Sequence, residues 1–123
     1  MVIALHHVNI TVPPESEQET KEFYGAVLQL KQLPKPRGSR PSGAWYEIGG
    51  CQLHLSVEAK QQSTRSSGHV CLAVADLETA ARRFREAGAE IIADPRPQEG
   101  TSRFYVRDPG GNLLEIAAVK TAD

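Results

Sequence analysis

The second half of this chain repeats the first, and this repeat constrains the fold more than any other feature of the sequence. Residues 6–30 (HHVNITVPPESEQETKEFYGAVLQL) align with residues 68–91 (GHVCLAVADLETAARRFREAGAEI). Residues 45–57 (WYEIGGCQLHLSV) then align with residues 104–119 (FYVRDPGGNLLEIAAV), and their Gly-Gly pairs are in register. A repeat of this kind predicts two copies of one supersecondary unit.

Each half begins with a segment in which polar and apolar residues alternate. In residues 7–12, His, Asn and Thr alternate with Val and Ile, and in residues 69–74, His, Cys and Ala alternate with Val and Leu. This period of two predicts a half-buried strand in each half. His7 and His69 occupy the same place in the repeat, and both lie on the face opposite the branched aliphatic residues.

A helix is expected to follow each of these strands, over residues 16–30 and 77–87. Asp76 stands where an N-cap would, and Gly88 stands where a helix would end. The apolar stripes are Phe23, Val27 and Leu30 in the first helix and Leu77, Ala80, Ala81 and Phe84 in the second. We expect both helices to cover the aliphatic side of the sheet.

A closing strand follows the Gly-Gly turn in each half, over residues 51–57 and 112–119. In the first of these strands, Gln52, His54 and Ser56 lie on one face, and Leu53, Leu55 and Val57 lie on the other. His54 falls on Glu115 in the register of the repeat. The polar faces of the four strands therefore carry four candidate metal ligands, which are His7, His54, His69 and Glu115.

Imidazoles with one carboxylate form a ligand set for a divalent metal such as Zn, Ni, Mn, Fe or Co, and they leave positions for water and substrate. If the two modules form one curved sheet, all four side chains can point into the same concave cleft. A lone strand histidine is more often structural or exposed, but matched positions in the two halves favour a shared central site. His6 is one residue out of phase, so we expect it on the opposite face, without a role in metal binding.

Charge and composition exclude several classes of function. The chain has 123 residues, a net charge of −1 and a pI near 6.4, which disfavours nucleic acid or an anionic membrane as a partner. The sequence shows neither a signal peptide nor a membrane-spanning apolar stretch. Cys51 and Cys71 have no CxxC spacing, which is typical of buried thiols in the cytoplasm. A reactive thiol or a metal contact is the alternative interpretation.

These segments together resemble the vicinal oxygen chelate superfamily, which includes glyoxalase I, fosfomycin-resistance and bleomycin-resistance proteins, and extradiol dioxygenases. The most specific motif is FYVRDPGGNLLEI, and the resemblance covers nearly the whole chain. It implies an α+β fold in which two βαβββ modules form an open barrel-like cleft. The chain would then be a single domain, with module one at about residues 1–58 and module two at about residues 67–120.

The resemblance also implies one divalent metal ion, with His7, His69 and Glu115 as ligands and a fourth ligand in the last strand of module one. Metal-dependent glyoxalases have a carboxylate or an amide at that fourth place, whereas this chain has His54, with Gln52 two residues before it on the same face. The loss of one carboxylate that can act as a base disfavours lactoylglutathione lyase activity. Glu115 remains available as a ligand or as a catalytic base.

Two classes of function are compatible with these residues. The first is a metal-dependent isomerase or lyase, epimerase or thiol transferase that acts on a small molecule chelating through adjacent oxygens. The alternative is a protein that binds and sequesters a small molecule without catalysis, as bleomycin-resistance proteins do, although those relatives generally lack the ligand set. Dioxygenase activity is less favoured, because dioxygenases commonly have two paired-module domains.

The resemblance also leads us to expect a homodimer, in which the modules pair either within one chain or across two. Four arginines could bind an anionic substrate or could simply be solvated, namely Arg37, Arg40, Arg103 and Arg107. Trp45 and Tyr46 either line the mouth of the cleft or pack in the core.

Overall fold

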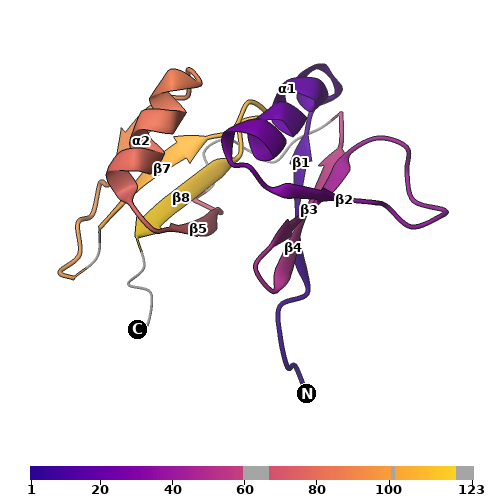
Figure 1. Cartoon of the computed structure of the whole chain (residues 1–123), viewed down its shortest axis with the longest axis horizontal. Helices are drawn as coiled ribbons and strands as arrows, with labels where there is room; N and C mark the ends of the chain where they lie inside the picture. Colours follow the sequence, from indigo (N-terminus) through magenta and orange to yellow (C-terminus); the bar gives the residue numbers. More distant parts are fainter. Residues whose placement is uncertain (60–66, 101, 119–123) are drawn as a thin grey trace. The chain divides into compact units, whose positions relative to one another are not determined.

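The computed structural model describes residues 1–59, 67–100 and 102–118, and divides the chain into two compact units, residues 1–62 and 63–123. In unit 1 a four-stranded sheet has the order β1-β4-β3-β2. Its elements are β1 (His7–Val12), η1 (Pro14–Ser16), α1 (Glu17–Glu22), η2 (Phe23–Val27), β2 (Lys31–Leu33), β3 (Ala44–Ile48) and β4 (Cys51–Val57). The strands β1 and β4 are parallel, and the other pairs are antiparallel (Figure 1).

Unit 2 repeats this topology, with the sheet order β5-β8-β7-β6 and a parallel pair formed by β5 and β8. Its elements are β5 (Val70–Val74), α2 (Leu77–Glu86), β6 (Ile91–Ala93), β7 (Arg103–Arg107) and β8 (Leu113–Ala118). A parallel pair needs a crossover connection, and the helical segment after the first strand of each unit belongs to that connection. The predicted α+β fold of two βαβββ modules is confirmed.

The helix predicted over residues 77–87 is confirmed, together with both of its ends. The side chain of Asp76 accepts hydrogen bonds from the backbone N–H of Glu78 (2.9 Å) and from the hydroxyl of Thr79 (3.0 Å). At the other end Gly88 has a φ of 80°, and the N–H groups of Gly88 and Ala89 donate to the carbonyls of Arg85 and Phe84. These two bonds form a Schellman motif, which ends the helix.

The single helix predicted over residues 16–30 is wrong in its continuity. The chain instead forms a 3-10 turn at Pro14–Ser16, an α-helix at Glu17–Glu22 and a π-helical turn at Phe23–Val27. The adjacent rings of Phe23 and Tyr24 are both buried in the core. Gln29 then adopts a left-handed φ of 58°, which a helix does not tolerate, so the helical segment ends before the predicted Leu30.

The core of each unit lies between its sheet and its helical segment. In unit 1 the ring of Tyr24 lies 6.0 Å from that of Tyr46, and in unit 2 the rings of Phe84 and Phe104 lie 6.0 Å apart, edge to face. The buried apolar side chains are Ile10, Val12, Phe23, Tyr24, Ala44, Tyr46, Leu53, Leu55, Phe84, Phe104, Val106, Leu114 and Ile116. Tyr46 therefore packs in the core, which was one of the two roles expected for it.

Gly43 closes the long loop before β3 at a position where only glycine fits. Its φ is 79°, and a Cβ atom at this position would lie 2.1 Å from the carbonyl oxygen of Leu55. Its N–H donates to the Glu17 carboxylate at 2.9 Å. Gly43 therefore lets the loop approach the backbone of β4, the strand that carries His54.

Candidate metal centre

In unit 1 the side chains of His7 and His54 meet on the polar face of the sheet. His7 belongs to β1 and pairs with Gln52 of the parallel strand β4, so His54 stands two residues further along that strand. The two imidazole rings are stacked, with centroids 4.1 Å apart and planes 14° apart. The ring of Trp45, which pairs with His54 across β3 and β4, covers His54 at 3.9 Å. The sequence thus correctly placed both histidines on one face.

His54 is nearly buried, with 7% of its surface exposed. Burial lowers the pKa of His54, and the nearby His7, His6 and Lys35 lower it further. Its Nε2 lies 2.9 Å from the side-chain oxygen of Gln52. A neutral imidazole is the form that binds a metal, so this environment suits a ligand. The contact also keeps Gln52 beside His54, as the strand pattern predicted.

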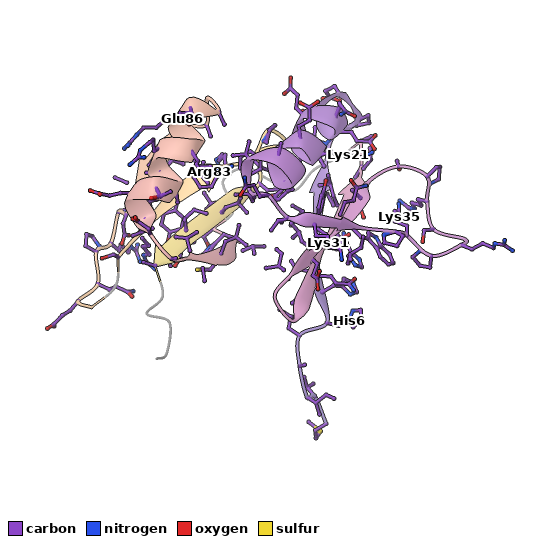
Figure 2. The ribbon with its side chains drawn as sticks, viewed as in Figure 1. His6, Lys21, Lys31, Lys35, Arg83 and Glu86 are labelled. Carbon is purple, nitrogen blue, oxygen red and sulfur yellow. The ribbon has the colours of Figure 1, made fainter. Side chains whose placement is uncertain are left out.

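The expected separation of His6 from His7 is wrong. The Nδ1 atoms of the two rings lie 2.9 Å apart, and the rings meet edge to face with centroids 5.1 Å apart. Figure 2 shows the side chain of His6 near the N-terminal end of β1. The prediction extended the strand alternation to His6, but β1 begins only at His7. The side chain of His6 is therefore not directed by the pleat, and it can turn toward its neighbour.

In unit 2 His69 and Glu115 are in direct contact, with His69 Nε2 2.9 Å from Glu115 Oε1. His69 Nδ1 lies 2.7 Å from the carbonyl oxygen of Ser67. A carbonyl can only accept a hydrogen bond, so Nδ1 carries the proton and Nε2 of the neutral ring presents a lone pair. An ionised Glu115 also presents lone pairs. The two acceptors therefore need a proton or a metal ion to hold them together.

Glu115 is 9% exposed and has four side-chain neighbours. Besides His69, the thiol of Cys71 donates to Oε2 at 3.4 Å, the hydroxyl of Tyr105 donates to Oε1 at 3.4 Å, and Arg103 Nη1 lies 3.6 Å from Oε1. Burial alone raises the pKa of Glu115, but the thiol of Cys71, the adjacent ring of His69 and the charge of Arg103 outweigh it and lower the pKa below its ordinary value. The environment thus favours the carboxylate.

Cys71 does not behave as the buried core thiol that was expected. The residue is exposed as a whole, yet its sulfur lies against Glu115. Burial of the thiol, together with its hydrogen bond to Glu115, raises the pKa of Cys71 to about 11. The signal for this contact was present in the sequence, because Cys71 stands two residues after His69 in the alternating pattern. Tyr105 was missed, and it shares the polar face because it pairs directly with Glu115 across β7 and β8.

The four arginines considered as anion ligands have different surroundings. Arg103 lies beside Glu115, and Arg107 donates from Nη1 to the carbonyl of Gly111 at 2.8 Å. Arg37 and Arg40 are exposed in the loop between β2 and β3. Only Arg103 of these four therefore adjoins a predicted ligand within the part of the chain that the structure describes.

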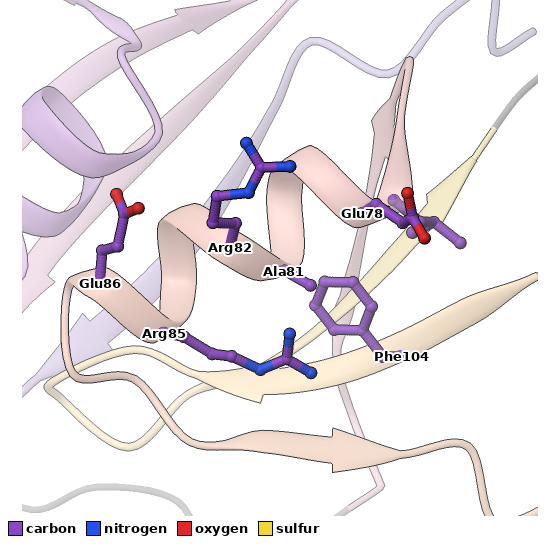
Figure 3. A pocket seen from close by; sticks show the side chains of 7 residues that line it. Glu78, Ala81, Arg82, Arg85, Glu86 and Phe104 are labelled. Atoms are coloured by element: carbon purple, nitrogen blue, oxygen red, sulfur yellow. The ribbon is translucent and has the colours of Figure 1, made fainter.

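A hollow of about 630 Å³ lies elsewhere on unit 2, along the side of α2 where the helix meets Phe104 of β7 (Figure 3). Arg82 and Arg85 of the helix and Phe104 of β7 are among its lining residues. Strand alternation places Phe104 on the helix side of the sheet, away from Arg103 and Tyr105. The hollow is therefore separate from the polar face that carries Glu115.

The four predicted ligands thus form two pairs, His7 with His54 in unit 1 and His69 with Glu115 in unit 2. Over residues 1–59, 67–100 and 102–118, no group of three or more His, Cys, Asp or Glu side chains is arranged to hold a metal ion. Each pair nevertheless has suitable chemistry. Two donors about 2.1 Å from one ion and at right angles around it lie about 3 Å apart, which fits the 2.9 Å between His69 Nε2 and Glu115 Oε1.

The sequence profile of the glyoxalase/bleomycin resistance protein/dioxygenase superfamily matches residues 4–116. The chain belongs to this superfamily. The metallothiol transferase FosB from Shouchella clausii is 29% identical to this chain, and the match covers 94% of this chain and 80% of FosB. Among the helices of the described residues, none has the length and apolar character needed to cross a membrane.

Solved structures of superfamily members share the fold. The crystal structure of a glyoxalase family protein from Bacillus anthracis has a TM-score of 0.84 and 29% identity, and the match covers 98% of both chains. A variant of the fosfomycin resistance protein FosX from Listeria monocytogenes has a TM-score of 0.82 at 18% identity, covering 98% of this chain and 95% of that one. That FosX structure contains Mn(II) and 1S,2S-dihydroxypropylphosphonic acid. At this identity FosX supports the fold alone.

Proposed function

We propose that this protein is a divalent-metal-dependent enzyme that acts on a small molecule chelating through adjacent oxygens. The reaction is of the isomerase or lyase, epimerase or thiol-transferase type. The observation that carries the proposal is the contact of His69 with Glu115. The Ser67 carbonyl accepts the proton on Nδ1 of His69, so Nε2 is the nitrogen that faces the carboxylate. Membership of the superfamily supports the same reading.

His7, His69 and Glu115 would bind the metal, which is Zn, Ni, Mn, Fe or Co, and His54 would be the fourth ligand, with Gln52 as its substitute. When bound, the metal supplies a Lewis acid for substrate oxygens. Glu115 can bind the ion or take up a proton from the substrate, because its surroundings favour the carboxylate form. Trp45 covers one face of His54 and limits how that ring can turn.

Thiol transfer is the first reaction to assay, because the FosB relative is named as a metallothiol transferase. The protein would work as a homodimer in the cytoplasm, an expectation that follows by analogy with the superfamily. Its partner in catalysis is a small molecule, as in the enzymes of the superfamily.

Metal analysis of protein purified without an affinity tag tests the proposal, followed by thiol-transfer and isomerase assays with the metal found. We expect one divalent ion per chain and an activity that disappears with a chelator and returns with the metal. A protein that neither retains nor binds a divalent ion, yet binds small molecules tightly, would contradict the proposal and support sequestration.

A further inference from the structure

Arg103 is held by the loop that follows β6. Its Nε donates to Asp94 Oδ2 at 2.9 Å, and its Nη2 donates to the carbonyl of Arg96 at 3.3 Å. The other carboxylate oxygen of Asp94 accepts the N–H of Arg96 at 2.9 Å, which fixes Asp94 within its own loop. The guanidinium is thus anchored along one side by two groups of a single short loop.

The anchored guanidinium stops short of Glu115. Arg103 Nη1 is 3.6 Å from Glu115 Oε1, which is longer than a hydrogen bond, whereas the contact with Asp94 has full hydrogen-bond length. All three side chains are largely buried, at 14% exposed for Arg103, 10% for Asp94 and 12% for Glu115. Water therefore reaches these side chains only in part, and the carboxylate that Arg103 contacts affects the charge beside Glu115.

A guanidinium with a free fork prefers to bind a carboxylate through two parallel hydrogen bonds. If Arg103 closed on Glu115 in this way, it would occupy the oxygen that now faces His69. It would also place a positive charge directly on the lone pairs that a cation needs. Asp94 prevents this closure, because it takes the Nε side of the fork.

We propose that Asp94 is a positioning residue that restrains Arg103 and so keeps the Glu115 carboxylate available to a metal ion. The proposal rests on the function proposed above, since it needs Glu115 to be a ligand. It assigns a role to the loop that follows β6, whose Asp94-Pro95-Arg96 segment lies outside the predicted ligand set. His69 and Cys71 contact Glu115 directly, whereas Asp94 acts on Glu115 through Arg103.

Titration calorimetry with Mn²⁺ alone tests this inference on the full chain. Asp94→Asn removes the charge but can still accept the Arg96 N–H, and we expect it to weaken Mn²⁺ binding by about tenfold, the lower end for groups that orient a ligand. Arg103→Gln should bind Mn²⁺ at least as well as wild type. Adding Asp94→Asn to Arg103→Gln should then change the affinity by less than about twofold.

Asp76→Asn is the matched control, because Asp76 caps α2 in the same unit and is not among the contacts of Glu115 or Arg103. Its Mn²⁺ affinity should equal that of wild type. Unchanged Mn²⁺ binding in Asp94→Asn, together with weak binding in Glu115→Gln, would overturn this inference and leave the proposed function intact. An equal loss with and without Arg103 would also overturn it, because the effect would not pass through Arg103. Wild-type protein without any Mn²⁺ binding would overturn both this inference and the proposed function.

Discussion

Replacing Gly43 with alanine should destabilise the protein far more than the same change at Gly38. Both residues have left-handed backbone angles, with φ of 79° at Gly43 and 93° at Gly38. This conformation costs a residue with a Cβ atom about 1–2 kcal/mol. At Gly38 nothing lies within 4 Å of the added Cβ, so Gly38→Ala should cost only that amount. Gly38 is therefore a control for the backbone angle.

At Gly43 the added Cβ would lie 2.1 Å from the carbonyl oxygen of Leu55, in a strand with partners on both sides. Relief of this clash requires a shift of β3 or β4, and it also disturbs the hydrogen bond from Gly43 to Glu17. The loss of two hydrogen bonds, the one from Gly43 to Glu17 and one between β3 and β4, adds about 1 kcal/mol each. The total for Gly43→Ala is then about 3–4 kcal/mol, a large part of the roughly 5–15 kcal/mol that stabilises a typical domain.

Urea unfolding followed by circular dichroism measures both variants. A loss of 1 kcal/mol corresponds to about 4 °C in a chain of this size, so Gly43→Ala should also lower Tm by about 12–16 °C and Gly38→Ala by about 4–8 °C. Equal losses in the two variants would contradict this prediction, because the contact with Leu55 would then contribute nothing. A more stable Gly43→Ala protein would refute the loop geometry itself.

Three further predictions concern the candidate site and its surroundings. Because the pKa of His54 is lowered in the folded protein, the unfolded chain takes up a proton first as the pH falls below about 6.5. In urea titrations the metal-free protein should therefore lose stability from pH 7.5 to pH 5. His54→Gln should show a weaker dependence of stability on pH. Cys71, with a pKa of about 11, should react slowly with iodoacetamide at pH 8, as followed by mass spectrometry. Glu115→Gln should speed this reaction, because it removes the carboxylate that accepts the hydrogen bond of the thiol. An unchanged rate would show that Glu115 does not hold the thiol. Thr20→Val should lower the free energy of unfolding in urea by about 1 kcal/mol, since the buried hydroxyl donates to the Ser16 carbonyl at 2.7 Å. Glu19→Gln, on the exposed side of the same helix, should lower it little. Equal losses would contradict a stabilising role for the Thr20 hydroxyl.

The repeat was sufficient to predict the fold, because each half carries its own strand periodicity and its own Gly-Gly turn. Helix α2 was predicted to within a residue, since Asp76 and Gly88 are local signals whose effects do not depend on distant parts of the chain. The first helical segment was harder to predict, because two adjacent aromatic rings are buried together there. Tertiary packing of Phe23 and Tyr24 thus overrode the helical period.

His7, His54 and Glu115 lie on the polar strand faces as expected, and His69 lies one residue before β5 instead of within it. The neighbours of these residues depend on details that the sequence does not express. The contact of His6 with His7 depends on where β1 begins, and an alternating pattern does not mark that point. Tyr105 reaches Glu115 through the register of β7 against β8. Arg103 reaches it through a loop conformation fixed by Asp94. Contacts of these kinds require the folded backbone.

We propose that the His7 and His54 pair and the His69 and Glu115 pair bind one metal ion together. Titration calorimetry with Mn²⁺ on wild type, His7→Ala and His69→Ala tests it most directly, with circular dichroism to check that each variant is folded. We expect one ion per chain, and a loss of more than about 100-fold in affinity from either substitution, although the two residues belong to different units. Wild-type affinity in the folded His7→Ala protein, or two independent ions per chain, would contradict it.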